Sequence, residues 1–361
     1  MTLALRLAQR AQGRTSPNPV VGAVVVKRNR IVGHGYHRRA GLPHAEVEAL
    51  RRAGRRARGS TLYVTLEPCN HSGRTPPCCD AILASGVARV VAATRDPNPL
   101  TDGRGVMRLR RAGLRVQTGV LAREAQQINE PFFTSMRTRM PLVIAKVGQS
   151  LDGKIATVRG ASRWITSAAS RRQSHRLRAQ VDAILVGITT VLQDDPLLTA
   201  RGTRTRADRP VKVIVDSRLR LPSTAQCLSP RSPAPTLIAT TVRTSARCAP
   251  LARRGTEILI FRPKQGRVPL RQLCQELVRR GLHSVLIEGG GEVLASAFAE
   301  RIVHRITWFV APTLIGGRRA PSALGGKGIA RLADAVRLRQ MHVRRLGADL
   351  CIEARVAYPP R

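Results

Sequence analysis

The chain has 361 residues, more than one ordinary domain holds, and this length predicts two domains. Hydrophobic residues make up 43% of it, which suffices for folded cores and argues against a disordered chain. The formal net charge of +40 comes almost wholly from arginine and is spread along the whole sequence. Aromatic residues amount to only 3%, so platforms on which nucleic-acid bases could stack are scarce. The charge alone therefore assigns no polyanionic partner.

Membrane and secretory signals are weak in this sequence. No apolar run approaches the roughly 20 residues that a membrane-spanning helix needs. The N-terminal segment from Met1 to Arg6 has the pattern of an amphipathic helix rather than of a signal peptide. The seven cysteines include the adjacent pair Cys78 and Cys79 and are otherwise scattered, unlike the disulfide framework of a secreted domain. We therefore expect a cytoplasmic protein.

The first part of the chain alternates between strand and helix patterns. Hydrophobic periodicity predicts two strands joined by a turn at Arg28 and Asn29, and then strands alternating with helices. The expected strands are 20–26, 31–36, 61–66, 88–93 and 114–118, and the expected helices are 45–50, 78–85 and 105–112. This order predicts a three-layer α/β domain.

A polar helical stretch over 119–140 ends at Pro141, where we place the domain boundary, giving domains 1–140 and 141–361. The second domain again alternates, which predicts another α/β fold. Its expected strands are 142–147, 182–186, 211–215, 236–240 and 284–287, and its expected helices are 168–178, 270–280 and 293–299. The segment 219–235 is rich in proline and serine and is expected to be a surface loop.

The sharpest chemical signal is a set of metal-ligating residues in the first domain. His44, Cys69 and a second cysteine supply one imidazole and two thiolates, and leave the fourth tetrahedral position of a zinc ion for water. Zinc lowers the pKa of bound water to about 7. Glu46 lies two residues from a ligand and is expected to act as the catalytic general acid and base. Chance placement of core histidine and cysteine is the alternative, and the chemistry leaves Cys78 and Cys79 both open as the third ligand.

Several motifs around these residues resemble those of one enzyme family. They are 15–22, 35–37, 43–47, 65–71, 73–78 and 96–99. Together they look like the deaminase half of the bifunctional riboflavin-biosynthesis deaminase/reductases, whose N-terminal domain is similar to cytidine deaminases. Eight residues separate Cys69 from Cys78, whereas deaminases of cytidine and of tRNA adenosine usually carry Cys-x-x-Cys. The resemblance selects Cys78 over Cys79.

The resemblance also implies a substrate, a 2,5-diaminopyrimidinone that carries a ribosylamino 5′-phosphate. A polar heterocycle and a ribose need hydrogen-bond donors and acceptors, and a phosphate suits an arginine. The residues that the resemblance brings to this substrate are Asn18, His37, His71, Arg74, Asp96 and Asn98. For Asn98, which lies between two prolines, stabilisation of a turn is an equally simple role.

The second domain lacks a Gly-x-Gly-x-x-Gly motif after a strand, so a Rossmann dinucleotide site is not indicated. Its motifs at 146–153, 162–166, 175–178, 182–187, 190–201 and 288–291 instead resemble the reductase half of the same family. That half is similar in fold to dihydrofolate reductase and takes its hydride from NADPH. The resemblance therefore covers nearly the whole chain.

Residue roles in the second domain follow from this resemblance. The NADPH site is implied to include Gly148, Trp164, Thr190, Asp194, Ser217, Gly290, Gly291, Glu292, Val293, Leu294, Ala295 and Ser296. The glycine-rich turn suits a pyrophosphate because free backbone N–H groups point at it. The substrate site is implied to include Ser162, Arg178, Leu198, Arg201 and Glu288, with Lys146 in a charge role near the reacting ribose. A tight turn at 289–291 and core packing of Trp164 are the plainer alternatives.

Two adjacent positions depart from the family, which commonly has an Asp-Glu pair where this chain has His304-Arg305; we treat this difference as drift. We expect an enzyme that deaminates the diaminopyrimidinone and then reduces the ribosyl chain to ribityl. Its partners are expected to be small phosphoribosyl pyrimidines, with no membrane and no nucleic acid, and a homo-oligomer stays open. The rival hypotheses are a nucleic-acid deaminase, a polyanion-binding protein without activity, and a chain with only one active half.

Overall fold

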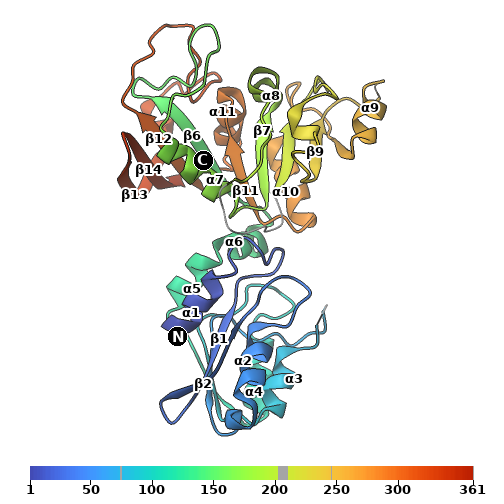
Figure 1. The fold of residues 1–361 in the computed structure, drawn as a ribbon, viewed down its shortest axis with the longest axis vertical. Coiled ribbons are helices and arrows are strands. Elements are labelled where there is room, and N and C mark those ends of the chain that lie inside the picture. Colours follow the sequence, from blue (N-terminus) through green and yellow to red (C-terminus); the bar gives the residue numbers. More distant parts are fainter. Residues whose placement is uncertain (74, 202–209, 245, 361) are drawn as a thin grey trace. The chain divides into compact units, whose positions relative to one another are not determined.

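The computed structural model describes residues 1–73, 75–201, 210–244 and 246–360 (Figure 1). The chain divides into two compact units, Met1–Arg139 and Met140–Arg361. Arg74, one of the expected substrate contacts, lies outside the described residues. None of the helices in the described ranges combines the length and apolar character that a membrane crossing requires.

The first unit is built on a five-stranded sheet. Its strand order is β2 (Arg30–Tyr36), β1 (Gly22–Lys27), β3 (Thr61–Val64), β4 (Arg89–Ala92) and β5 (Arg115–Thr118). Strand β1 runs antiparallel to β2 and β3, whereas β3, β4 and β5 are parallel. Arg28 and Asn29 take positive φ angles of 47° and 60°, as expected for the tight turn between β1 and β2.

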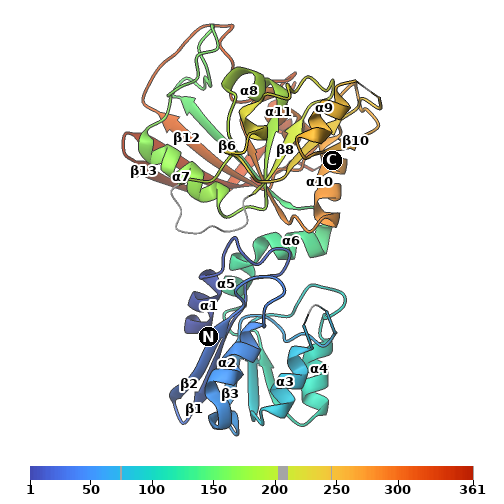
Figure 2. The same ribbon diagram turned by 45° about the vertical axis from the view of Figure 1, so that its right-hand side comes forward.

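Helices cover both faces of this sheet, as predicted for a three-layer domain (Figures 1 and 2). One face carries α1 (Thr2–Gln9) and α5 (Ala122–Ile128), and the other carries α2 (Ala45–Ala53), α3 (Cys78–Ala84) and α4 (Arg104–Arg111); α6 (Glu130–Thr138) follows α5. Packing is close where α1 meets β1, because a Cβ built on Gly22 would lie 2.0 Å from the carbonyl oxygen of Ala4. Cys69 follows the carboxyl end of β3, and Asp96 and Asn98 follow that of β4.

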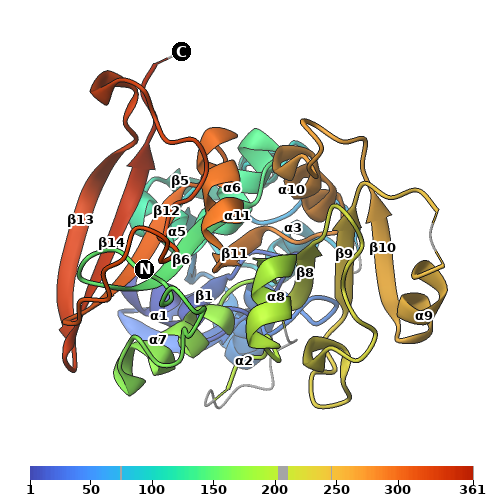
Figure 3. The ribbon, with the colours of Figure 1, turned by 90° about the horizontal axis from the view of Figure 1, so that it is seen from above.

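The second unit holds a nine-stranded sheet (Figure 3). Its order is β10 (Thr256–Ile260), β9 (Thr236–Thr240), β8 (Val211–Val215), β7 (Ala183–Gly187), β11 (Ser284–Glu288), β6 (Leu142–Ser150), β12 (Arg305–Ala311), β14 (Asp349–Ala357) and β13 (Arg337–Leu346). The seven strands from β10 to β12 are parallel, and β14 and β13 are antiparallel additions at one edge.

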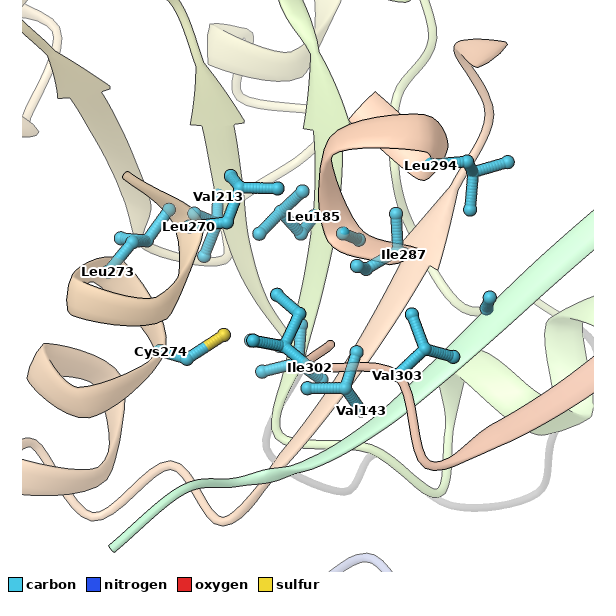
Figure 4. Packing of buried hydrophobic residues seen from close by; sticks show 14 of the residues in the cluster. Val143, Leu185, Val213, Leu270, Leu273, Cys274, Ile287, Leu294, Ile302 and Val303 are labelled. Carbon is cyan, nitrogen blue, oxygen red and sulfur yellow. The ribbon is translucent and has the colours of Figure 1, made fainter. Parts of the chain in front are cut away.

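Apolar clusters fill both sides of this sheet. On one side α10 (Leu270–Arg279) and α11 (Gly291–Ala299) pack on the strands through residues such as Leu273, Ile287 and Leu294 (Figure 4). On the other side lie α7 (Ala168–Arg178), α8 (Ile188–Asp194) and α9 (Cys248–Arg253) (Figure 3). The buried strands, apolar on both faces, explain why the sequence shows them as continuous hydrophobic runs.

The structure also contains elements that the hydrophobic pattern does not predict. Strand β13 is exposed along nearly its whole length and carries arginine at 337, 339, 344 and 345. Strand β10 lies at the opposite edge of the sheet, with Glu257 and Ile260 exposed. Edge strands do not need a continuous apolar run, so they give a weak signal in the sequence.

Candidate active sites

Two helix starts and the segment after β3 bring together the three expected zinc ligands. His44 is the residue before α2, and Cys78 is the first residue of α3. The Nδ1 atom of His44 lies 3.0 Å from Sγ of Cys78 and 3.6 Å from Sγ of Cys69. The ligand atoms of the three residues all lie within 4.8 Å of one another. One imidazole and two sulfur donors at this spacing fit a zinc ion with an open fourth position.

The two sulfurs differ in their protonation when no metal is bound. A hydrogen bond from Cys78, together with His44, lowers the pKa of Cys69 to about 4, although burial opposes this shift. The same hydrogen bond and burial raise the pKa of Cys78 well above its usual range. The backbone N–H of Cys78 also donates to Sγ of Cys69 at 3.3 Å. In the metal-free protein the negative charge therefore lies on Cys69.

Glu46 and Cys79 occupy different positions around this cluster. Glu46 lies in the first turn of α2 and is only 3% exposed, and its burial raises its pKa to about 7. The thiol of Cys79 points away from the cluster, toward the carbonyl oxygens of Pro68 at 3.7 Å and Gly105 at 3.8 Å. The structure thus places Cys78, and not Cys79, against His44 and Cys69.

Asn18 and His37 lie together beside the metal ligands. The amide nitrogen of Asn18 is 3.1 Å from Nε2 of His37, and Nδ1 of His37 is 3.2 Å from the carbonyl oxygen of Pro43. The ring of His37 meets that of His44 edge-on, with centroids 5.1 Å apart. Burial lowers the pKa of His37. A neutral imidazole and a side-chain amide here offer the hydrogen bonds that a heterocycle needs.

The expected contacts Asp96 and Asn98 stabilise the turn that carries them. Oδ1 of Asp96 accepts from the backbone N–H of Asn98 at 2.9 Å, and Oδ1 of Asn98 accepts from that of Leu100 at 3.1 Å. Thr101 in the same loop lies 3.4 Å from Nδ1 of His71. Burial raises the pKa of Asp96 to about 7. Asn98 therefore does stabilise a turn, which was the alternative role expected for it, and this does not exclude a contact with substrate.

In the second unit a buried carboxylate organises the expected substrate residues. Glu288, at the end of β11, accepts from Arg178 through Nε–Oε1 at 2.7 Å and through a terminal nitrogen to Oε2 at 2.6 Å. Lys146 on β6 has its Nζ 3.7 Å from the same Oε2. Burial would raise the pKa of Glu288, but Arg178 and Lys146 lower it to about 2. Burial lowers the pKa of Lys146.

The segment 198–201 adjoins this ion pair. The carbonyl oxygen of Thr199 accepts from Arg178 at 3.0 Å, and the backbone N–H of Arg201 lies 3.2 Å from Nδ1 of His175. Leu198 is buried and has a positive φ of 52°. Arg178, Glu288, Lys146 and Arg201 are thus gathered on one part of the unit, as the resemblance implies for a phosphoribosyl substrate.

The expected cofactor residues surround the turn between β11 and α11. Gly289 and Gly290 have positive φ angles of 75° and 77°, and a Cβ on Gly290 would lie 3.3 Å from Oγ1 of Thr190 on α8. Glycine is required for this backbone, which brings a helix N-terminus and a hydroxyl together. The arrangement fits a dinucleotide pyrophosphate. Leu294 is buried in the core, so only its backbone is available to a cofactor.

The other expected cofactor residues have identifiable partners. Asp194 accepts from the hydroxyl of Ser162 at 2.7 Å, which joins a cofactor candidate to a substrate candidate. The hydroxyl of Ser217, after β8, accepts from the N–H of Val268 at 3.1 Å. Trp164 is 69% exposed, which rules out core filling as its role. A Cβ on Gly148 would lie 3.1 Å from a methyl group of Thr166.

Comparison with known proteins decides the family. The model of the cytidine and deoxycytidylate deaminase zinc-binding region matches residues 1–94, and the model of the RibD C-terminal domain matches residues 141–352. The riboflavin biosynthesis protein RibD of Aquifex aeolicus is 45% identical over 98% of this chain and 96% of its own. This chain belongs to the RibD family. A RibD structure from Acinetobacter baumannii has a TM-score of 0.90 at 38% identity, covering 99% of this chain and 97% of that one.

A second solved structure carries both activities in its name. It is a diaminohydroxyphosphoribosylaminopyrimidine deaminase/5-amino-6-(5-phosphoribosylamino)uracil reductase from Thermotoga maritima. It has a TM-score of 0.86 at 33% identity and covers 99% of this chain and 97% of that one. RibD membership confirms the expected fold class, a cytidine-deaminase-like domain followed by a dihydrofolate-reductase-like domain. It also confirms an enzyme with a zinc-dependent deaminase domain and an NADPH-dependent reductase domain.

Two structurally central residues of this RibD chain were given no role from the sequence. Lys212 on β8 is 1% exposed, and its ammonium group donates to the carbonyl oxygen of Ser232 at 2.6 Å, to the hydroxyl of Ser232 at 3.0 Å and to the carbonyl oxygen of Cys227. Glu67 is 3% exposed and lies in the motif 65–71, which contains the expected zinc ligand Cys69. The sequence could have indicated Lys212, because it is the one charged residue in the otherwise apolar strand Val211–Val215.

Proposed function

We propose that this chain catalyses two consecutive steps of riboflavin biosynthesis. The first is hydrolytic deamination of 2,5-diamino-6-(5-phosphoribosylamino)pyrimidin-4(3H)-one in domain 1–140. The second is NADPH-dependent reduction of 5-amino-6-(5-phosphoribosylamino)uracil in domain 141–361. The observation that carries the proposal is the buried Glu46 beside the His44–Cys69–Cys78 cluster, in one chain with the Arg178–Glu288 pair.

Deamination replaces the amino group of a cyclic amidine by oxygen from water and releases ammonia. His44, Cys69 and Cys78 would hold zinc, which when bound supplies a Lewis acid that makes water more acidic. Glu46 takes a proton from the attacking water and gives a proton to the departing amino nitrogen. Its buried carboxyl group, with a pKa of about 7, suits both directions of proton transfer near neutral pH.

Substrate binding in this domain is assigned to the polar residues around the cluster. Asn18 and His37 are proposed to hydrogen-bond the pyrimidine, since the ring of His37 meets that of His44 and Asn18 lies 3.1 Å from His37. His71, Asp96 and Asn98, which share the neighbouring loops, are proposed to contact the heterocycle and ribose. Arg74 is proposed for the phosphate on the strength of the family resemblance.

Reduction opens the ribose ring and adds a hydride to C1′, so the product carries a ribityl chain. NADPH, when bound, supplies that hydride. Glu288, Arg178 and Arg201, with Ser162 and Leu198, are proposed to position the phosphoribosyl substrate. Lys146 is proposed to provide the charge beside the reacting carbon, because Glu288 holds its ammonium group, 3.7 Å away, beside Arg178.

The proposed cofactor site joins separate parts of the second unit. It comprises Gly148, Trp164, Thr190, Asp194, Ser217, Gly290, Gly291, Glu292, Val293, Leu294, Ala295 and Ser296. The turn at Gly290 supports the assignment, because its backbone conformation presents the start of α11 to a pyrophosphate. Glu292 is held by Arg267 at 3.0 Å and by the N–H of Gly326 at 3.1 Å, which orders the first turn of α11.

We propose further that the protein works in the cytoplasm on small molecules, without nucleic acid or membrane partners. The arginine excess is spread over both units, and the zinc cluster lacks the Cys-x-x-Cys spacing usual in nucleic-acid deaminases. Assembly into a homo-oligomer is compatible with this function.

One assay tests both halves. Purified, zinc-loaded protein is given the diaminopyrimidinone ribosyl phosphate with and without NADPH, and products are identified by mass. We expect exchange of an NH group for oxygen without NADPH, and a further gain of two hydrogens with it. A folded, zinc-containing sample that converts nothing contradicts the proposal. Deamination of a deoxyoligonucleotide or tRNA by that sample would support the rival nucleic-acid activity.

A further inference from the structure

Glu67 is a buried carboxylate with three backbone partners. It follows β3, and its Oε1 accepts from the N–H of Val106 at 3.0 Å. Its Oε2 accepts from the N–H of Gly103 at 3.0 Å and from that of Asp96 at 3.2 Å. Among the described residues no lysine, arginine or histidine pairs with it. An ionised group is costly to bury without such bonds, so the three donors form a site built around this carboxylate.

The three donors lie on one continuous segment. Asp96 and Gly103 delimit the loop 96–103, and Val106 lies in the first turn of α4. The backbone N–H of Glu67 also donates to the carbonyl oxygen of Thr94, just before the loop, at 3.0 Å. Glu67 therefore fixes the beginning and the end of the loop whose side chains include Asp96 and Asn98.

The helix that follows the loop packs closely on the segment that carries Glu67. A Cβ on Gly105 would lie only 1.9 Å from the carbonyl oxygen of Pro68, so the start of α4 packs directly on the Glu67–Pro68 segment. Gly103 has a positive φ of 79°, which lets the chain turn into α4 there. With the start of α4 fixed in this way, the Glu67 carboxylate acts on the loop itself, through the N–H groups of Asp96 and Gly103.

The zinc ligand after Glu67 is held by different bonds. Sγ of Cys69 accepts from the N–H of Cys78 at 3.3 Å, and the carbonyl oxygen of Cys69 accepts from the N–H of Cys79 at 3.2 Å. These contacts come from α3 and do not involve Glu67. The position of Cys69 and the position of the loop are consequently separable.

We infer that Glu67 is a positioning residue of the deaminase site, which holds the loop 96–103 so that Asp96 and Asn98 face the pyrimidine substrate. The inference rests on the proposed function and deepens it. Because Glu67 acts on substrate contacts and not on the metal ligands, its loss should weaken substrate binding while the chemical step stays largely intact.

The test variant is Glu67→Gln, which keeps the size of the side chain but turns one acceptor oxygen into a donor amide. At least one of the three N–H groups then loses its partner. We expect KM for deamination to rise on the order of tenfold and kcat to change by less than about threefold. Zinc content should stay at the parent level, and KM for reduction in the same preparation should not change.

Glu48→Gln is the matched control, because Glu48 is also buried in this unit but bonds to the side chain of Arg51 at 2.9 Å. It should leave KM for deamination at the parent value. Glu67→Asp keeps the charge on a shorter side chain and should raise KM by a smaller factor, which provides a test if Glu67→Gln does not fold.

Parent-like KM in the folded Glu67 variants would overturn the inference, and so would loss of zinc, which would place Glu67 in support of the metal ligands. A parent protein that does not deaminate the diaminopyrimidinone would instead contradict the proposed function.

Discussion

Arg178 and Glu288 form a bidentate ion pair between α7 and the end of β11, with nitrogen–oxygen distances of 2.7 and 2.6 Å. Both side chains are largely buried, at 17% and 7% exposure. The planar guanidinium matches the carboxylate, and a second cation, Lys146, lies 3.7 Å away. The pair thus provides a fixed charge arrangement at the place where the phosphoribosyl substrate is proposed to bind.

Glu288→Gln replaces one oxygen by an amide nitrogen, yet it should strongly reduce both the reductase activity and the stability of the second unit. It removes the only carboxylate that the described residues place beside Arg178 and Lys146, and leaves two buried cations together. We expect reduction to fall at least a hundredfold, and the free energy of unfolding of the second unit to drop by about 3 kcal/mol. NADPH oxidation and denaturant unfolding measure the two effects.

Glu276→Gln serves as the control for this change. Glu276 forms ion pairs with Arg279 and Arg280 on the exposed side of α10, and such pairs contribute less than about 1 kcal/mol. This variant should retain reduction, and deamination should be retained by both variants. Full reductase activity in Glu288→Gln would remove Glu288 from the proposed site.

The two adjacent cysteines should differ in their effect on zinc. Cys78→Ser removes a sulfur that lies 3.0 Å from His44, so we expect loss of bound zinc and of deamination. Cys79→Ser changes a thiol that faces Pro68 and Gly105, and zinc should be retained. Metal content by mass spectrometry after dialysis distinguishes them. The opposite pattern would make Cys79 the ligand.

Glu46→Gln tests the proton-transfer role independently of the metal. The amide has nearly the same shape but cannot take a proton from water, so deamination should fall by about 10²- to 10⁴-fold. Zinc content and NADPH-dependent reduction of the uracil intermediate should remain as in the parent. Deamination at the parent rate would show that another group moves the proton.

Much of the fold follows from hydrophobic periodicity. Val211–Val215 and Thr236–Thr240 have the bounds that the sequence predicts, because each is a short apolar run that begins after a proline. Ala168–Arg178 also has the predicted bounds, and it begins after Ser167, whose side chain accepts from the N–H of Ser170 as a helix cap. Strands β13 and β10 escape prediction, because edge strands bury little. The predicted set also lacks β12 and β14, although both lie inside the sheet and β12 is largely buried. The zinc cluster is visible in the sequence because its residue types are chemically specific.

Residues that act through backbone hydrogen bonds give no comparable signal. Glu67 can be seen in the sequence, but its three partners lie 29 to 39 positions away and offer only N–H groups, which every non-proline residue has. Lys212 bonds to two carbonyl oxygens and a hydroxyl in the 227–232 segment in the same way. Their roles depend on the chain path, which periodicity does not specify.

His304, the residue before β12, gives a pH-dependent prediction for the second unit. Its Nδ1 accepts from the backbone N–H of Val143 at 3.1 Å, which requires that nitrogen to be unprotonated. Burial, and then the charges of Arg271 and Arg355, lower its pKa from an ordinary 6.5 to about 4. Between these values the unfolded chain binds more protons than the folded one, so stability present above pH 6.5 is lost as the pH falls toward 4.

The expected loss for the second unit is on the order of 2 kcal/mol over this range, measured by denaturant unfolding at successive pH values. His304→Gln keeps an acceptor for Val143 but does not titrate, so its stability should fall less between pH 6.5 and 4. Glu288, whose pKa is lowered from 4.5 to about 2, begins to lose its contribution near pH 4.5, but it does so in the parent and in His304→Gln alike, so the difference between the two curves belongs to His304. Parallel curves for the parent and His304→Gln would show that His304 is not the titrating group, and that its burial against Val143 carries no proton-linked free energy.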